Sequence, residues 1–445
     1  MENMYGMRWL VVSLFCVCPL WMNAQSVEEM QKALDAYDYE TPIVQIAPES
    51  GDSLLTPLRA KALKAMNRYW EARKEWESLL PADSADVKIL VELGECYRLM
   101  SRNELAALCY GKALELHPDN HFFRQQHVRT LLAAENYEAA HDAAYAWVVK
   151  DSLSAMGYKY LGMACEGLAS NDQTLFSRMS YSYHKAYLLN PHDGQTVAHL
   201  AAIYNAKEQY SDAVIVTESY RRFDTGNRDV NRQNAKAYCM MKNYDKAVER
   251  YTELKASGDM SFTTLYYLGI SCYGKKWFHE AEKHLSEAQQ LRPSVPADVS
   301  LLYHLAKASS HASNQERGVA LMKEAIEMVK PSDNLVKRLY EGLVDCYSRW
   351  EDGDPYDKIE VMKKTYDLNK EYTLFYKIAE IYNHQKDYDN AVYYYEKFMS
   401  MVPKDKQGPL DENGKPKAGW RSLYWEASKK LEKIKEDSFF RGEVK

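Results

Sequence analysis

The 445-residue sequence has few of the residues that interrupt helices, with 19 glycines and 14 prolines. Long apolar runs are also missing apart from residues 9–21, so no second stretch approaches the roughly 20 apolar residues of a membrane-spanning helix. The formal net charge of −6 excludes the global basic excess of many nucleic-acid-binding proteins. These shortages, together with apolar residues recurring at helical spacing, indicate a nearly all-helical chain.

Residues 1–24 have the composition of a secretory signal peptide. Arg8 precedes the apolar stretch 9–21, and Ala24 is a suitable residue for cleavage. Met1 and Met7 both remain open as the start, and an uncleaved amphipathic or buried segment is the alternative. We therefore expect an exported protein in the periplasm or envelope of a Gram-negative-type bacterium, with no integral membrane span after cleavage.

A small residue recurs at nearly constant intervals along the chain. From Gly94, aromatic and small residues follow at fixed offsets and Pro118 closes the series; the same offsets from Gly269 and Ala379 reach a similar series. This pattern is an internal repeat. We call the recurring small residue of each repeat its anchor, and the ten anchors, spaced 34 to 39 residues apart, are Ala60, Gly94, Val128, Gly162, Ala201, Ala235, Gly269, Ala306, Val344 and Ala379.

A 34-residue period with this series resembles the tetratricopeptide repeat (TPR) family, here of an exported bacterial type. The resemblance implies an all-α fold, an α-solenoid that forms a right-handed superhelix of about ten helix–turn–helix units with a C-terminal capping helix. Gly94 costs a helix about 1 kcal/mol relative to alanine. Its role is therefore interpreted as structural, because it lets the second helix of its unit pack closely.

The repeat divides the chain into five expected segments. These are a signal peptide (1–24), an N-terminal helical cap (25–52), the repeat array (53–403), a loop (404–418), and a capping helix with a tail (419–445). Longer connections are expected after Gly162, around Pro293 and over residues 349–358. Such insertions are expected to fall in turns and to spare the helices.

Motifs for catalysis and cofactor binding are missing from the sequence. It contains no phosphate-binding loop, no G-x-S-x-G and no H-E-x-x-H, and Pro118 interrupts the helical spacing of His117 and His121. We therefore predict no enzyme activity, no cofactor and no metal site. Among the cysteines, Cys96 and Cys109 share one helical hairpin and form the one plausible disulfide pair.

The resemblance implies a non-catalytic scaffold that binds a partner protein or extended peptide in a concave groove lined by the first helix of each unit. A stretch of basic residues that leads into aromatic residues predicts a partner with acidic and apolar parts, and not a nucleic acid. By the phase of the repeat, the expected groove residues are Arg129, Lys159, Asn205, Arg232, Lys236, Tyr266, Tyr303 and Tyr376.

Three alternatives stay open. The basic residues could pair with Glu95, Glu166 or Asp229 and only solvate the face. The protein could be a structural or assembly subunit of an envelope complex without a discrete groove, or a binder of a glycan or small ligand. The Lys/Asn clamp of cochaperone members is not expected, because no asparagine directly follows an anchor.

Overall fold

The computed structural model describes residues 26–80, 86–168, 173–291, 298–329, 333–408 and 422–440, and all regular structure in these ranges is helical. The expected signal peptide and most of the expected 404–418 loop lie outside the described residues. The chain divides into two compact units. Unit 1 is Met1–Ala206 with Arg222–Asp224, and unit 2 is Lys207–Arg221 with Thr225–Lys445.

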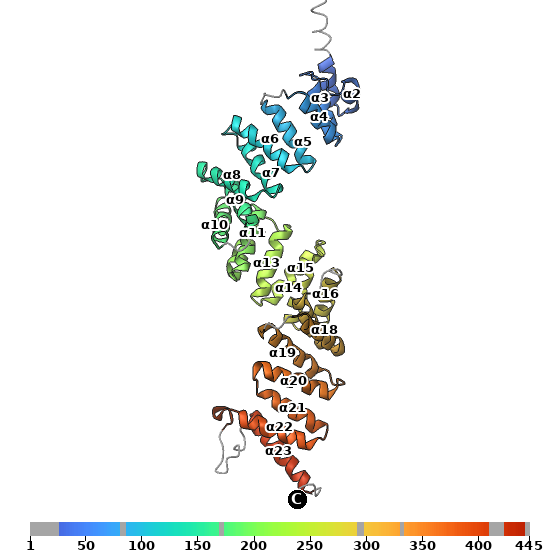
Figure 1. The fold of residues 1–445 in the computed structure, drawn as a ribbon, viewed down its shortest axis with the longest axis vertical. Coiled ribbons are helices and arrows are strands. Elements are labelled where there is room, and N and C mark those ends of the chain that lie inside the picture. The colour runs from blue at the N-terminus through green and yellow to red at the C-terminus, as the bar shows by residue number, and fades with distance from the viewer. Residues whose placement is uncertain are drawn as a thin grey trace, which may run out of the picture. The chain divides into compact units, whose positions relative to one another are not determined.

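Unit 1 begins with a helical stretch over residues 26–35 and continues as helix pairs joined by short turns (Figure 1). Consecutive helices contact each other along the unit. Its helices are α2 (Glu40–Gln45), α3 (Thr56–Ala65), α4 (Tyr69–Ser78), α5 (Val87–Leu99), α6 (Asn103–Leu116), α7 (His121–Ala133), α8 (Tyr137–Lys150), α9 (Ala155–Leu168), α10 (Gln173–Leu189) and α11 (Gly194–Ala206).

Unit 2 repeats this arrangement, and its first helices also contact the first helices of the next pair. Stacked helix pairs of this kind form an α-solenoid. The helices are α12 (Tyr210–Arg221), α13 (Arg228–Met240), α14 (Tyr244–Ala256), α15 (Phe262–Gly274), α16 (Phe278–Gln290), α17 (Val299–His311), α18 (Gln315–Met328), α19 (Asp333–Arg349), α20 (Pro355–Asn369), α21 (Thr373–His384), α22 (Tyr388–Met401), the 3₁₀ turn η1 (Lys404–Lys406) and α23 (Leu423–Phe440).

All ten anchors are buried, and the glycine anchors face the second helix of their own pair. A Cβ atom at Gly94 would lie 3.0 Å from Cε2 of Tyr110, the aromatic residue of the facing helix. The same atom at Gly269 would lie 2.6 Å from Cγ of Leu285. The structural interpretation of Gly94 is confirmed, since the missing side chain makes room for the large residue of the partner helix.

The turn between the two helices has the same backbone geometry in eight repeats. The residue seven positions after the anchor has φ between 57° and 68°, although it is never glycine. The next residue donates its N–H to the carbonyl five positions earlier, as from Asn243 to Tyr238 at 2.9 Å. This is the Schellman arrangement that ends a helix. Side chains of Asn136, Asn243 and Asp387 then cap the second helix.

The expectation that insertions spare the helices is wrong for one repeat. The extra residues after Gly162 extend α10 to 17 residues, whereas most second helices have 12 to 14. The extra turn of α10 adds internal hydrogen bonds, which an enlarged loop would not provide. The expected longer connection over 349–358 is present, because α19 ends at Arg349 and α20 begins at Pro355.

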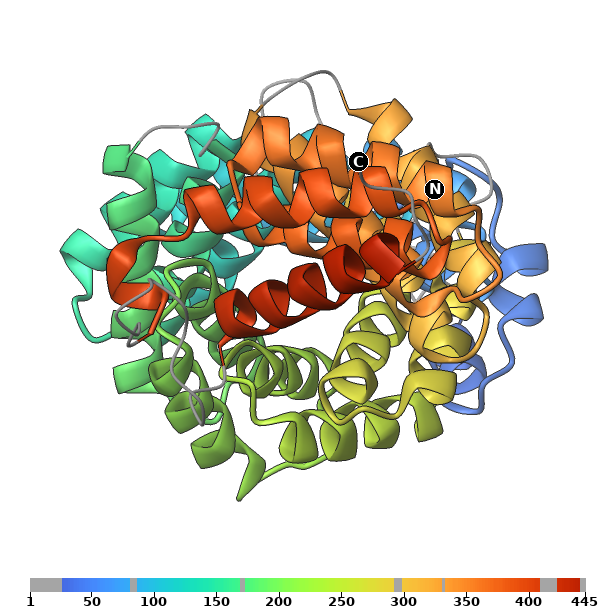
Figure 2. The same ribbon diagram turned by 90° about the horizontal axis from the view of Figure 1, so that it is seen from below.

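Helices at both ends cover the terminal pairs. In unit 1, Met30 and Ile46 from the leading segment pack with Leu58 of α3. In unit 2, Ala427 and Ile434 of α23 are buried in the same core as α21 and α22. Figure 2 shows α23, in dark red, lying beside α22. Terminal helices of this kind shield the apolar surface of an array from water.

Candidate functional site

The eight residues expected to line a groove all lie on first helices, but the structure gives them different surroundings. Two of them, Lys159 and Arg232, are held by ion pairs inside the fold. Both stand three positions before an anchor, and each meets an aspartate that precedes the next first helix. Lys159 Nζ lies 3.0 Å from Asp193 Oδ2, and Arg232 Nη2 lies 2.8 Å from Asp259 Oδ2.

The alternative that the basic residues form ion pairs therefore holds for these two residues. Only one of the expected partners, Asp229, is among the carboxylates that they contact. Arg232 Nη1 also contacts the expected Asp229 at 2.8 Å. Of the other expected partners, Glu95 pairs with Arg98 and Glu166 with His199. Lys159 and Arg232 accordingly stabilise the junction between successive pairs.

Two further residues lie in the interior. Asn205 is 5 % exposed on α11, and Tyr376 is 9 % exposed on α21. The Tyr376 hydroxyl donates a hydrogen bond to Glu426 at 3.1 Å and accepts one from Lys430 at 3.4 Å. The expectation that Tyr376 faces a groove is wrong, because α23 covers it.

Arg129, Lys236, Tyr266 and Tyr303 remain partly accessible. Arg129 is half-buried on α7 in unit 1, and it has no ion pair within the described parts of the chain. The other three residues lie in unit 2. With three residues that sequence reasoning missed, they form a surface that we call the first-helix face of unit 2: Lys236, Tyr266, Tyr303, His304, Lys307 and Arg338.

Aromatic and cationic side chains alternate across this face. Lys236 Nζ lies 5.8 Å from the ring centre of Tyr267, and Tyr266 meets His304 edge-on at 5.9 Å. Tyr303 has Lys307 Nζ at 5.7 Å and Arg338 Cζ at 5.9 Å from its ring centre. The face thus runs continuously over α13, α15, α17 and α19.

Gly342 of α19 gives the Tyr303 ring its position. A Cβ atom at Gly342 would lie 2.9 Å from Cε2 of Tyr303 and 2.8 Å from Cε of Met322. A side chain there would push the ring away from α19. The close approach brings Tyr303 within cation–π distance of Arg338, which stands one helical turn before Gly342.

Two cations, Lys307 and Arg338, flank His304, and Lys307 Nζ lies 3.7 Å from Asp345 Oδ2. Burial lowers the pKa of His304 to about 4, with further lowering by the charges of Lys307 and Arg338. The imidazole is therefore neutral at pH 7, and within the described residues its nitrogens make no hydrogen bond. Arg338 is exposed and, over the same residues, pairs with no carboxylate. The Arg338 guanidinium and the His304 imidazole are therefore available to an anionic ligand.

The structure also bears on metal binding and on disulfide formation in the part of the chain that it describes. It holds no group of three or more His, Cys, Asp or Glu side chains that could bind a metal ion. Cys96 and Cys109 are free thiols and not a disulfide; burial raises their pKa values to about 12 and about 11. No helix among these residues is long and apolar enough to cross a membrane.

Comparison with known families decides the affiliation of the chain. Residues 373–405, which comprise α21, α22 and the following turn, match the sequence model of the tetratricopeptide repeat. The chain therefore contains a tetratricopeptide repeat over α21 and α22, and its other helix pairs have the same helix–turn–helix arrangement. The comparison of this TPR chain with curated proteins gives no match.

Solved structures of other TPR proteins resemble parts of this TPR chain at low identity. MamA from Desulfovibrio magneticus RS-1 is 18 % identical, covers 40 % of this chain and 98 % of its own, and has a TM-score of 0.34. Yeast Tom70 is 13 % identical over 87 % of this chain and 96 % of its own, with a TM-score of 0.31. YrrB, described as a TPR protein with an unusual peptide-binding site, is 14 % identical over 45 % of this chain and 99 % of its own, with a TM-score of 0.37.

The residues that sequence reasoning missed had recognisable signals in this TPR chain. His304 directly follows Tyr303, and Lys307 directly follows the anchor Ala306. Arg338 stands six positions before the anchor Val344, the same place that Ser300 has before the anchor Ala306. Arg338 is exposed and His304 and Lys307 are half-buried, all on first helices, so a search by phase over all polar side chains would have found them.

Proposed function

We propose that this protein is a non-catalytic interaction scaffold and that the first-helix face of unit 2 binds an extended segment of a partner protein. The segment would carry carboxylate and apolar side chains. The TPR fold supports protein–protein interaction in general, since stacked pairs offer long continuous surfaces. We further propose that the protein acts in the cell envelope, which rests on the signal-like composition of residues 1–24.

The observation that carries the proposal is the set of unused polar groups around Tyr303. Arg338 offers a planar guanidinium that can bind a carboxylate with two hydrogen bonds. His304 is neutral and can donate one N–H to the same anion or to a peptide carbonyl. The rings of Tyr266 and Tyr303 provide contact area for apolar side chains, and tyrosine and arginine are enriched where binding energy concentrates in interfaces.

The alternative of a structural accessory subunit without a discrete binding face makes a different prediction. It does not require unpaired cations on one side of the first helices, and it predicts that reversing their charge leaves partner capture unchanged. The two hypotheses can therefore be separated by charge reversal at residues that have no structural partner.

The experiment is affinity purification from the envelope fraction after mild cross-linking, followed by mass spectrometry. We expect Lys236→Glu/Arg338→Glu to reduce partner recovery at least tenfold, because both cations would face the partner's carboxylates. Recovery by the native protein should also fall with added salt. The matched control is Lys283→Glu/Lys364→Glu, which makes the same charge change on the second helices α16 and α20.

Unchanged recovery by a folded Lys236→Glu/Arg338→Glu protein would contradict the binding role of this face and favour the accessory subunit. Equal loss in the control variant would show that net charge alone governs capture. A circular dichroism melt of each variant establishes that it is folded before recovery is compared.

A further inference from the structure

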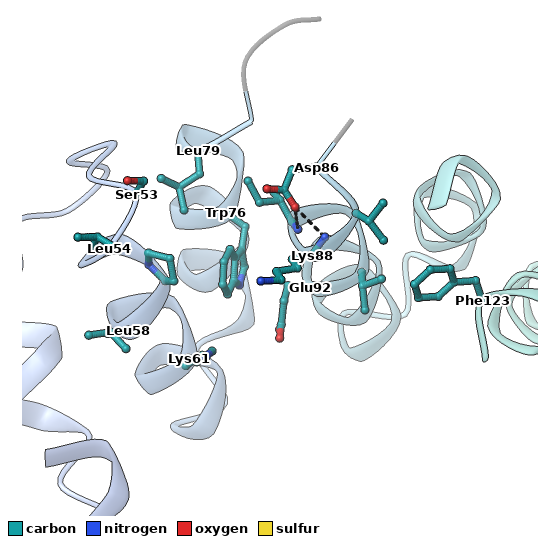
Figure 3. Close-up of a pocket in the computed structure, with 14 residues that line it drawn as sticks. Ser53, Leu54, Leu58, Lys61, Trp76, Leu79, Asp86, Lys88, Glu92 and Phe123 are labelled. Carbon is teal, nitrogen blue, oxygen red and sulfur yellow. Dashed lines mark hydrogen bonds between the residues drawn. The ribbon is translucent and has the colours of Figure 1, made fainter. Parts of the chain in front are cut away.

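Unit 1 contains two pockets whose surroundings differ. The first, of about 850 Å³, lies around Trp76, and the exposed Asp86 and Lys88 stand at its rim (Figure 3). Asp86 accepts the backbone N–H of Lys88 at 2.8 Å, and Leu54 is the exposed large apolar side chain among the residues that line this pocket. The second, of about 690 Å³, lies between α6, α7 and the start of α8, and at Leu108 it continues into a row of exposed apolar side chains.

This row extends over three second helices of unit 1. We call it the second-helix face of unit 1: Leu105 and Leu108 on α6, Tyr145 and Val149 on α8, and Tyr181 and Leu188 on α10. Five of the six residues are more than half exposed. Large exposed apolar patches on a folded protein mark interaction sites, because water disfavours them.

The repeat itself does not require an apolar face here. The helices α14 and α16 of unit 2 are described throughout and expose no large apolar side chain. Leu108 stands fourteen positions after its anchor Gly94, and the same count from the anchors Ala235 and Gly269 reaches Glu249 and Lys283. The second-helix face of unit 1 is therefore a feature of this part of the chain.

The helices α6, α8 and α10 lie side by side. Lys150 at the end of α8 reaches Asp119, which follows α6, at 2.5 Å. Arg178 Nη1 on α10 lies 2.9 Å from Nε2 of His141 on α8. The apolar residues of the three helices therefore belong to one surface.

The charges on this surface are ordered from one side to the other. The helices α6 and α8 each carry two carboxylates and one lysine, whereas both charged side chains of α10 are cationic. These residues are Glu104, Lys112 and Glu115 on α6, Glu138, Asp142 and Lys150 on α8, and Arg178 and Lys185 on α10. The charges sum to zero, which does not favour an anionic lipid surface, because such a surface attracts clusters of cations.

We propose that the second-helix face of unit 1 binds the same face of a second copy of this chain, related to the first by a two-fold axis through the middle of α8. This axis sets α8 antiparallel to α8 of the second copy, so that Glu138 at its start meets Lys150 at the end of the other. It also sets the acidic α6 against the basic α10. A two-fold interface requires a patch that complements itself in this way.

The apolar contacts fit the same arrangement. With α6 against α10 of the second copy, Tyr181 of one copy would enter the α6–α7 pocket beside Leu108 of the other, and Val149 would lie near the axis. All of these residues belong to unit 1, and none is shared with the first-helix face of unit 2. A dimer would carry two copies of that face, so a partner with repeated segments would bind it more tightly.

The first test is sedimentation velocity of the purified protein over a series of concentrations. We expect a dimer, and we expect Leu108→Glu/Val149→Glu to dissociate at least tenfold more readily, because each copy would bury two new charges. The matched control is Leu368→Glu/Tyr393→Glu, which changes apolar residues that are 40 % and 55 % exposed on α20 and α22. It should dissociate within twofold of the native protein, and a circular dichroism melt establishes that each variant is folded.

The second test examines the two-fold arrangement. Glu138→Lys and Lys150→Glu should each weaken the dimer about fivefold, because like charges then meet at both symmetric contacts. An equimolar mixture of the two variants should restore dimerisation, since each contact again joins unlike charges. A mixture that stays as weak as its components would overturn the arrangement.

Three results would overturn the proposal as a whole. One is a native protein that remains monomeric at every concentration up to its solubility limit. Another is a folded Leu108→Glu/Val149→Glu protein that dimerises normally. The third is a native monomer that co-floats with neutral phospholipid vesicles while Leu108→Glu/Val149→Glu does not, which would assign the face to a lipid surface.

Discussion

Arg232 and Arg338 lie on first helices of the same unit, but only Arg232 is held by ion pairs within the described residues. Arg232 on α13 contacts Asp229 and the buried Asp259, which is 7 % exposed. Arg338 on α19 lies over the face of Tyr303 and has no ion pair within the described residues. The comparison shows that a row of basic side chains read from a repeat is not one functional surface. A cation with a buried carboxylate stabilises the fold, and a cation without one is available to a partner.

The largest expected effect is that of Arg232→Glu on stability. It removes the counter-ion of Asp259 and places a third carboxylate beside Asp229 and Asp259. Breaking a buried pair by removing one partner costs about 3–5 kcal/mol. We expect about 3 kcal/mol, because Arg232 is itself 26 % exposed, measured as a loss in the unfolding free energy by urea titration. A loss below 1 kcal/mol would show that Asp259 does not depend on Arg232.

The pH dependence of stability sharpens the same contrast. Burial alone would raise the pKa of Asp259, but hydrogen bonds from Ser261, Arg232 and Thr264 lower it from the ordinary 3.8 to about 2. Because the folded-state pKa is depressed, this carboxylate contributes stability above pH 4 and loses that contribution as the pH falls towards 2. Urea titrations should therefore show native protein and Arg232→Gln differing most above pH 4 and converging near pH 2. A constant difference across this range would contradict the assignment.

The smallest expected effect on stability is that of Arg338→Glu. Its side chain is exposed and loses only a cation–π contact, and substitutions at such surface positions usually change the unfolding free energy by no more than about 0.5 kcal/mol. We expect its urea midpoint to match that of the native protein while partner recovery falls. A large destabilisation would instead assign Arg338 the same structural role as Arg232.

Much of the fold could be predicted from the sequence, because the anchors report the packing of each helix pair directly. The small residue at Gly94 and the large residue at Tyr110 must fit one another, and this constraint recurs with the period of the repeat. The counter-ions were harder to predict. Asp193 and Asp259 precede the next first helix and belong to connections whose length varies, so the repeat alone does not bring them to Lys159 and Arg232.

The surfaces were predicted less well than the core for a related reason. The phase of a helix says which side a residue occupies, but not which other element covers it. Tyr376 has the phase of a groove residue, yet α23 returns after a long connection and covers it. The pocket around Trp76 depends on residues from four helices and the turns beside them, and no single spacing in the sequence encodes that combination.

The cysteines can serve as built-in probes of local unfolding. All six in the described residues are free, three in unit 1 (Cys96, Cys109, Cys165) and three in unit 2 (Cys239, Cys272, Cys346), and burial raises the pKa of each thiol. Alkylating reagents attack the exposed thiolate, so each of the five buried cysteines reacts only as fast as its own helix pair opens, whereas Cys109 is partly accessible. The time course of alkylation, followed peptide by peptide, would therefore rank the pairs of both units by their resistance to opening, in the native sequence and without an added probe.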